Sequence, residues 1–243
     1  MAARAGLWRR LARALAWAAG LALVASVFAV LFLRFVPPFT SAFMFESRLA
    51  AWRAGDVSYR LEYRWTPWHA ISRHAKLAVI AAEDQKFAFH PGFDFEAIDR
   101  ALREREQGGR RRGASTISQQ VAKNLFLWSG PNFVRKGCEA YLTMLIELLW
   151  PKQRILEVYL NIAEFGPGVY GVGPAAAHYF RTTAAQLTRE QSALLAAVLP
   201  SPAQLHVARP SAYVLQRQEW IVAQMNRLGG REYIEQVEGR AER

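Results

Sequence analysis

The sequence predicts a mainly α-helical protein in which one transmembrane helix precedes a single globular domain with a short β-hairpin or edge strand. Three observations support this fold class. Residues 14–33 contain no charged side chain, as is typical of a membrane span. Beyond residue 70 the apolar residues recur mostly at helical spacing. Only residues 57–65 alternate apolar and polar side chains as a strand does.

The uncharged run has the length of a bilayer crossing. At about 1.5 Å per residue, it forms roughly 30 Å of helix, which matches one hydrocarbon core. A cleaved signal peptide is the alternative, but its apolar region usually spans about 7–15 residues and ends at a small-residue cleavage site. Pro37 and Pro38 follow here with no such site before them, so a retained anchor is the preferred interpretation.

The charges before this run predict its orientation. All of them are basic, namely Arg4, Arg9, Arg10 and Arg13. Positive residues near a span tend to stay on the cytoplasmic side of the membrane. We therefore expect a cytoplasmic N-terminus at residues 1–13, a transmembrane helix at residues 14–34 and a domain outside the cytoplasm at residues 35–243.

The net charge of +11 suggests an anionic partner. Phospholipid headgroups and a phosphorylated substrate both fit it, whereas the predicted topology disfavours nucleic acid. The single cysteine, Cys138, cannot form an intramolecular disulfide. The fold must therefore depend on its core, and the apolar 52% of the residues is enough to build one.

The domain begins with a strand at residues 57–65 and two helices. Residues 74–85 are too apolar for a surface helix, which predicts a central one. Residues 95–105 are amphipathic, with Ile98 and Leu102 on one face. Gly108-Gly109 and the arginines at 110–112 then predict a mobile basic loop, with a solvated charge run as the alternative.

Helices continue to the end of the chain. We expect them at residues 116–126, 134–149, 154–163 and 188–199. The last of these has a capping box between Thr188 and Gln191 and a stop at Pro200. Glycines at positions 166, 168, 171 and 173 mark a loop, and residues 209–243 tend to helix but indicate no chemistry.

Candidate chemistry begins at the end of the apolar helix, where Glu83 and Asp84 are adjacent. Desolvation at such a helix end raises the pKa of a carboxyl group and suits a general base. Glu83 is therefore the candidate base, while Asp84, about 100° around a helix from it, orients the site or meets a cation. A solvated helix end is the alternative for both. His90 is expected to bond backbone groups at the following turn.

A second polar set opens a later helix and consists of Ser115, Thr116, Gln119, Gln120 and Lys123. A helix start with hydroxyl groups and backbone N–H groups suits sugar hydroxyls or phosphate oxygens. Gln119 and Gln120 lie four and three residues before Lys123, so each is its neighbour on the helix surface. Capping alone would explain the hydroxyls, but not the glutamines and the lysine.

Arg135, Lys136 and Glu139 form a third set. The spacing of Arg135 and Glu139 also fits an ordinary surface salt bridge. Together with Lys123 the two basic residues would offer three cations, which suit a phosphorylated substrate. Glu139 would then either hold Arg135 in place or bridge to a divalent metal on the phosphates.

Residues 83–92 and 113–120 resemble the first two signature motifs of the peptidoglycan glycosyltransferases. The resemblance continues through Arg135-Lys136 with Glu139, through residues 152–161 and through residues 170–180, and covers roughly residues 60–205. The chain has about the length of the monofunctional biosynthetic members, which lack a transpeptidase domain. The resemblance implies a lysozyme-like glycosyltransferase domain.

The resemblance also implies an inverting enzyme of cell-wall biosynthesis that joins lipid II units into β-1,4-linked glycan and releases undecaprenyl diphosphate. Glu83 would be the base and Glu139 a second catalytic residue. The substrate would be bound by Asp84, Ser115, Thr116, Gln119, Gln120, Lys123, Arg135 and Lys136.

A divalent cation, Mg²⁺ or Mn²⁺, would lie on Glu139 or Asp84, with no organic cofactor. The implied partners are lipid II, the growing glycan strand, the membrane and other cell-wall synthesis or division proteins, and no nucleic acid. The implied location is the inner membrane, crossed once, with a periplasmic catalytic domain.

One departure and two rival functions qualify this expectation. Similar proteins usually carry an arginine after the glycine of Trp128-Ser129-Gly130, where this chain has Pro131. A lytic peptidoglycan glycosidase on the same fold would need a carboxylic acid but no phosphate-binding cations. An inactive membrane-anchored cell-wall scaffold is favoured by Pro131 alone, and the intact Glu83 opposes it.

Overall fold

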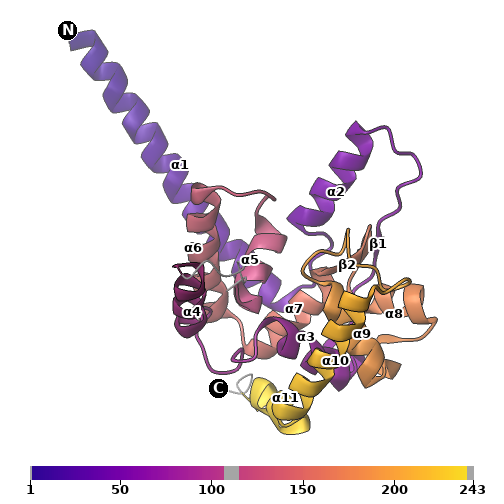
Figure 1. Ribbon diagram of the computed structural model, residues 1–243. Helices are drawn as coiled ribbons and strands as arrows, with labels where there is room; N and C mark the ends of the chain where they lie inside the picture. Colours follow the sequence, from indigo (N-terminus) through magenta and orange to yellow (C-terminus); the bar gives the residue numbers. More distant parts are fainter. Residues whose placement is uncertain (1, 107–114, 240–243) are drawn as a thin grey trace. The chain divides into compact units, whose positions relative to one another are not determined.

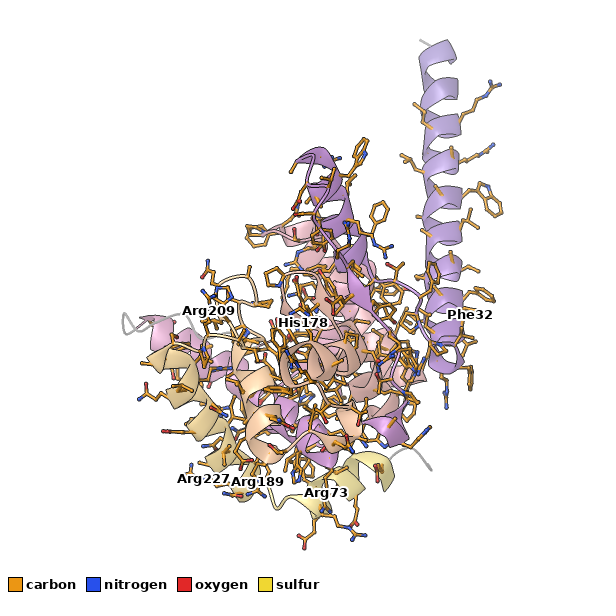
Figure 2. All side chains as sticks on the ribbon, turned by 90° about the vertical axis from the view of Figure 1, so that its right-hand side faces the viewer. Phe32, Arg73, His178, Arg189, Arg209 and Arg227 are labelled. Carbon is orange, nitrogen blue, oxygen red and sulfur yellow. The ribbon has the colours of Figure 1, made fainter. Side chains whose placement is uncertain are left out.

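The computed structural model describes residues 2–106 and 115–239, and its elements are almost all helices (Figure 1). The chain forms two compact units, Met1–Pro37 and Pro38–Arg243. The first unit is one helix, α1 (Ala2–Phe35), and its part Arg10–Phe35 is long and apolar enough to cross a membrane. Apolar side chains such as Phe32 stand out along it (Figure 2).

The second unit confirms the expected mainly α class. Its elements in chain order are α2 (Ala42–Arg53), β1 (Glu62–Tyr63), η1 (Trp68–Ala70), α3 (Arg73–Glu83), α4 (Phe95–Glu106), α5 (Ile117–Phe126), α6 (Phe133–Leu149), α7 (Lys152–Ile162), β2 (Glu164–Gly166), β3 (Val169–Tyr170), α8 (Val172–Phe180), η2 (Ala184–Gln186), α9 (Arg189–Val198), α10 (Ala212–Arg227) and α11 (Arg231–Gly239).

Helix α3 lies at the centre of this unit, as its composition predicts. Every residue from Ala75 to Ala81 is buried, and the helix packs against α9, α10 and α11. It ends at Glu83, so the expected extension to Gln85 is wrong. Asp84 leaves the helical conformation, with φ −161° and ψ 77°, because its side chain is held by a later part of the chain.

The strands form one small sheet in the order β1-β3-β2. β1 is parallel to β3, and β2 is antiparallel to it. The strand expected at residues 57–65 is paired only at Glu62–Tyr63, because its partner β3 is equally short. The predicted glycine loop contains the β2–β3 hairpin. Gly171 has φ +89°, and a Cβ there would lie 2.7 Å from the backbone oxygen of Asn161.

Helix α2 had no predicted counterpart. It begins at the N-cap Ser41 and packs against α5. Ser47 Oγ lies 2.6 Å from the Tyr170 hydroxyl, which joins α2 to the sheet. Glu46 accepts hydrogen bonds from the backbone N–H and hydroxyl of Ser129, so α2 also holds the loop that precedes α6.

Candidate active site

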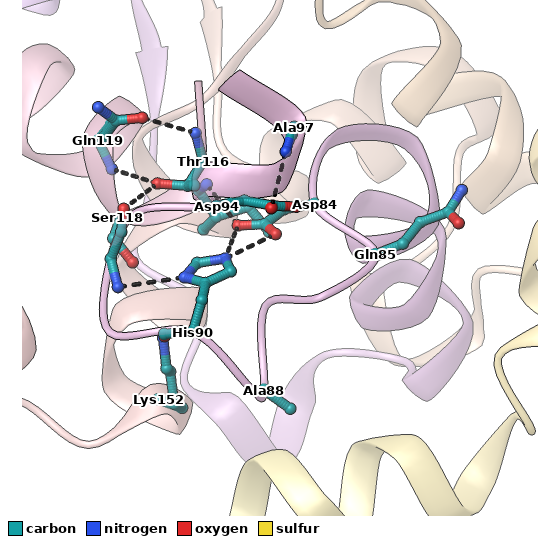
Figure 3. Close-up of polar contacts among 12 residues, drawn as sticks. Asp84, Gln85, Ala88, His90, Asp94, Ala97, Thr116, Ser118, Gln119 and Lys152 are labelled. Atoms are coloured by element: carbon teal, nitrogen blue, oxygen red, sulfur yellow. Dashed lines mark hydrogen bonds and ion pairs between the residues drawn. The ribbon is translucent and has the colours of Figure 1, made fainter. Parts of the chain in front are cut away.

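Asp84 joins the first two motifs (Figure 3). Its carboxylate is buried and accepts from His90 Nε2, at 2.8 and 3.0 Å, and from the backbone N–H of Ile117 at 3.0 Å. His90 Nδ1 accepts from the backbone N–H of Gly92 at 3.1 Å, so the proton of the neutral ring lies on Nε2. The turn role expected for His90 is present, but its bond to Asp84 was not anticipated. Asp84 therefore holds the turn at His90 against the start of α5.

Thr116 and Gln119 connect the start of α5 to the same turn. The Thr116 hydroxyl donates to the oxygen of Gly92 at 2.6 Å and accepts from the Gln119 N–H at 3.2 Å. Gln119 Oε1 accepts from the Thr116 N–H at 3.0 Å, which completes a capping box. Gln119 Oε1 therefore serves a helix cap, and substrate binding by Gln119 stays a prediction. The hydroxyl of Thr116 is committed to the same cap.

Lys152 supports this loop from α7 (Figure 3). Its ammonium donates to the backbone oxygen of His90 at 2.7 Å and pairs with Glu147 at 2.7 Å. Gly92 lies so close to α6 that a Cβ there would be 2.9 Å from both Glu147 and Thr143. The first motif is therefore seated rigidly on α6 and α7.

Glu83 is the last residue of α3 and accepts a 2.9 Å hydrogen bond from Gln120 Nε2. The Tyr159 hydroxyl donates to Gln120 Oε1 at 3.0 Å, which turns the amide nitrogen of Gln120 toward Glu83. Arg217 Nη2, from α10, lies 3.5 Å from the other carboxylate oxygen of Glu83. Burial raises the pKa of Glu83, while the Gln120 hydrogen bond and the Arg217 charge oppose that rise. Such a carboxylate suits a general base.

Glu83 opens onto a cavity of about 360 Å³. Ser115 and Thr116 line one part of it, and Arg100 and Glu104 of α4 line another. Trp220, from α10, lines it as well and is 45% exposed. An aromatic face beside hydrogen-bonding groups and a carboxylate suits a sugar ring.

Of the expected cation cluster, Arg135, Lys136 and Glu139 lie together on α6. Glu139 is buried and pairs with Arg135 Nη1 at 2.7 Å and with Lys136 Nζ at 2.5 Å, so an ordinary surface salt bridge is the wrong interpretation. The Lys123 ammonium lies 5.4 Å from the centre of the Phe43 ring of α2. Burial lowers the pKa of Lys123, with Glu139 opposing this and Arg135 and Lys136 adding to it. These four groups therefore act on one another.

Comparison with known proteins agrees with this arrangement. Residues 53–226 match the family model described as Transglycosylase. The chain belongs to the transglycosylase family. It is therefore a glycosyltransferase.

Several curated relatives match nearly the whole chain, and all are named biosynthetic peptidoglycan transglycosylase. The protein of Pseudomonas fluorescens Pf-5 is 54% identical over 95% of this chain and 94% of its own length. That of Pseudomonas syringae pv. tomato DC3000 is 55% identical over 93% and 94%. That of Stutzerimonas stutzeri A1501 is 53% identical over 94% and 92%.

The transglycosylase site does not fit a divalent cation on either predicted ligand. Both carboxylate oxygens of Glu139 are paired with cations, and those of Asp84 are bonded to His90 and Ile117. Within residues 2–106 and 115–239, no cluster of three His, Cys, Asp or Glu side chains could hold a metal. Glu139 instead holds Arg135, which is the other role that the sequence allowed.

Several residues of the site were not predicted, among them Tyr159, Arg217 and Trp220. Arg217 and Trp220 lie on α10, in the region judged uninformative, and that judgement is wrong. One signal was available, because Arg217 stands three residues after Val214 and four before Ile221, both buried. An arginine on the apolar stripe of a helix calls for a partner in the interior.

Two other predictions concern the surroundings of the site. The basic residues Arg110–Arg112 lie outside the described residues. Pro131 is exposed, beside Gly130, whose backbone oxygen accepts from Arg135 Nε at 2.9 Å. Arg135 thus joins the loop before α6 to Glu139. Helix α2 holds the same loop through Glu46, although all of α2 except Arg53 lies before the family match.

Proposed function

We propose that this transglycosylase polymerises lipid II into β-1,4-linked glycan with inversion and releases undecaprenyl diphosphate. The observation that carries the proposal is the pairing of two features around one site. A largely buried carboxylate, Glu83, lines the cavity and is held by Gln120 of α5. The same helix carries Lys123 and packs against α6, which carries the ion pairs of Arg135 and Lys136 with Glu139. Proton removal and departure of a diphosphate require these two kinds of group.

In the proposed reaction Glu83 removes the proton from the 4-hydroxyl of an incoming lipid II. The freed oxygen attacks the anomeric carbon of the growing strand, which is still attached to its lipid diphosphate. As the new C–O bond forms, the bond from the anomeric carbon to the diphosphate breaks, and undecaprenyl diphosphate leaves with the electron pair. The proton stays on Glu83 until solvent removes it.

The chain's own residues divide this work. Gln120, oriented by Tyr159, keeps the carboxylate of Glu83 in place. Lys123, half-buried beside Phe43, and Arg135, held by Glu139, provide positive charge fixed before the reaction starts. Because these cations need no reorganisation, they stabilise the leaving diphosphate more effectively than water would.

The two rival functions explain less of the site. A lytic glycosidase has no anionic leaving group, so it gives no reason for a lysine whose pKa is lowered by burial and by two neighbouring cations. A scaffold gives no reason for a carboxylate that is kept in a cavity by both an amide and a guanidinium group.

The function can be tested with the protein purified in detergent and incubated with labelled lipid II. We expect long glycan that a muramidase degrades. The control is a related transglycosylase that is purified and assayed in the same way. If the control polymerises labelled lipid II and this protein leaves it unconverted, the proposed function is wrong.

We further propose that the domain is periplasmic and anchored by α1 in the inner membrane, since the basic residues precede the span. A reporter that is active only outside the cytoplasm should be active when fused after Arg243 and inactive when fused before Met1. The reverse pattern in a full-length, inserted protein would overturn the orientation and the access to lipid II that depends on it.

A further inference from the structure

Among the residues that the structure describes, Arg217 is the cation that lies within ion-pair distance of Glu83. It lies on α10, which packs directly against α3, the helix that ends at Glu83. Its side chain is 21% exposed, and Nη2 is 3.5 Å from Glu83 Oε1. This contact joins residues 134 positions apart in the chain, and the fold alone brings them together.

The Nε–H of Arg217 is buried and has no hydrogen-bond partner among the residues that the structure describes. Nε and Nη2 lie on the same edge of a guanidinium group, and this edge forms two parallel hydrogen bonds with a carboxylate. The unpaired donor therefore belongs to the edge that approaches Glu83. Buried donors without partners are rare in folded proteins, so this one calls for an explanation.

We propose that Arg217 is a positioning residue for the catalytic base, and that its Nη2 and Nε edge holds the Glu83 carboxylate ionised and directed at the cavity. The inference rests on the proposed function, because it assigns Arg217 a part in the same proton removal. Gln120 holds one oxygen of the carboxylate, and Arg217 faces the other.

Several other groups around Glu83 also affect its pKa, and they determine what the loss of Arg217 would change. Lys123 from α5 also favours the charged carboxylate, whereas burial and the neighbouring Asp84 disfavour it. Tyr159 from α7 lies close enough for its pKa to be raised by Glu83, after the larger effect of its own burial. Without Arg217, one opposing charge is lost and burial is unchanged, so the pKa of Glu83 should rise further.

The test compares Arg217→Met with Arg217→Lys, and uses Arg227→Met as the matched control. Arg227 is at the surface at the end of the same helix (Figure 2). The measurement is the rate of lipid II polymerisation as a function of pH. For Arg217→Met we expect the acidic limb to move to higher pH, with at least ~10-fold loss at its low-pH end and partial recovery at high pH.

Arg217→Lys should keep most of the activity and the wild-type profile, because it retains the charge, and Arg227→Met should match wild type. The inference is overturned if Arg217→Met lowers the rate equally at every pH, or leaves it unchanged. It is also overturned if Arg217→Met and Arg217→Gln both fail to fold, because Arg217 would then serve packing.

A thermal unfolding cycle separates this inference from the proposed function. Glu83→Gln, Arg217→Met and the double variant need no substrate. If the two residues are paired, the two changes in melting temperature will not add. Additive changes would overturn the pairing, even in an enzyme that polymerises lipid II. Non-additive changes in a protein that ignores lipid II would support the pair and reject the proposed function.

Discussion

Replacing Glu83 with Gln is expected to reduce glycan polymerisation by at least ~10²-fold, the usual contribution of a general base. The substitution keeps the size of the side chain and a hydrogen-bond acceptor, but the amide cannot take the proton of the acceptor hydroxyl. The loss should appear in kcat rather than in KM, because binding of the sugar does not depend on this proton.

The measurement is the steady-state rate on labelled lipid II, with thermal unfolding to verify the fold. Glu219→Gln, a matched change at an exposed position of α10, should leave the rate at the wild-type level. A Glu83→Gln variant that polymerises lipid II at nearly the wild-type rate would remove Glu83 from the role of base.

Replacing Lys123 with Met should also reduce turnover strongly, by about 10²-fold, the loss seen when one preorganised donor to a developing anion is removed. Lys123 is the cleaner probe of the cluster because no ion pair joins it to the buried Glu139 among the described contacts. Arg135→Ala should likewise reduce turnover, but it also leaves Glu139 with Lys136 as its remaining ion-pair partner among the described residues and weakens the fold.

The rate of each variant should be followed together with its melting temperature. Lys123→Met is expected to lower kcat with little change in stability, whereas Arg135→Ala should lower both. Arg103→Met removes a positive charge at an exposed position of α4 and provides the control. If Lys123→Met changes only KM, the lysine binds the ground state, and the role assigned to it in bond cleavage fails.

Short-range patterns were enough to predict the central elements. The unbroken apolar run before Glu83 predicted that α3 is buried, and its last residue proved to be the carboxylate of the cavity. The Thr188 capping box was found from its spacing and is present. The same spacing occurs at Thr116 and Gln119, so the cap that explains Gln119 was also readable from the sequence.

Contacts between distant parts of the chain could not be predicted in this way. The extended conformation of Asp84 follows from a bond to α5, and the short β1 follows from a two-residue partner more than a hundred positions later. Arg217 reaches Glu83 only because α10 packs on α3. Helical spacing predicts the faces of these helices, but the choice of partner depends on the packing of the whole domain.

The most direct test of the account supplies one preparation of the wild-type protein with two substrates, lipid II and purified cell wall. If Glu83 and the cation cluster serve polymerisation, lipid II should yield glycan and one undecaprenyl diphosphate for each glycosidic bond formed. The purified wall should release no soluble muropeptides. Digestion of the wall by a preparation that leaves lipid II unchanged would contradict the account and establish the lytic alternative.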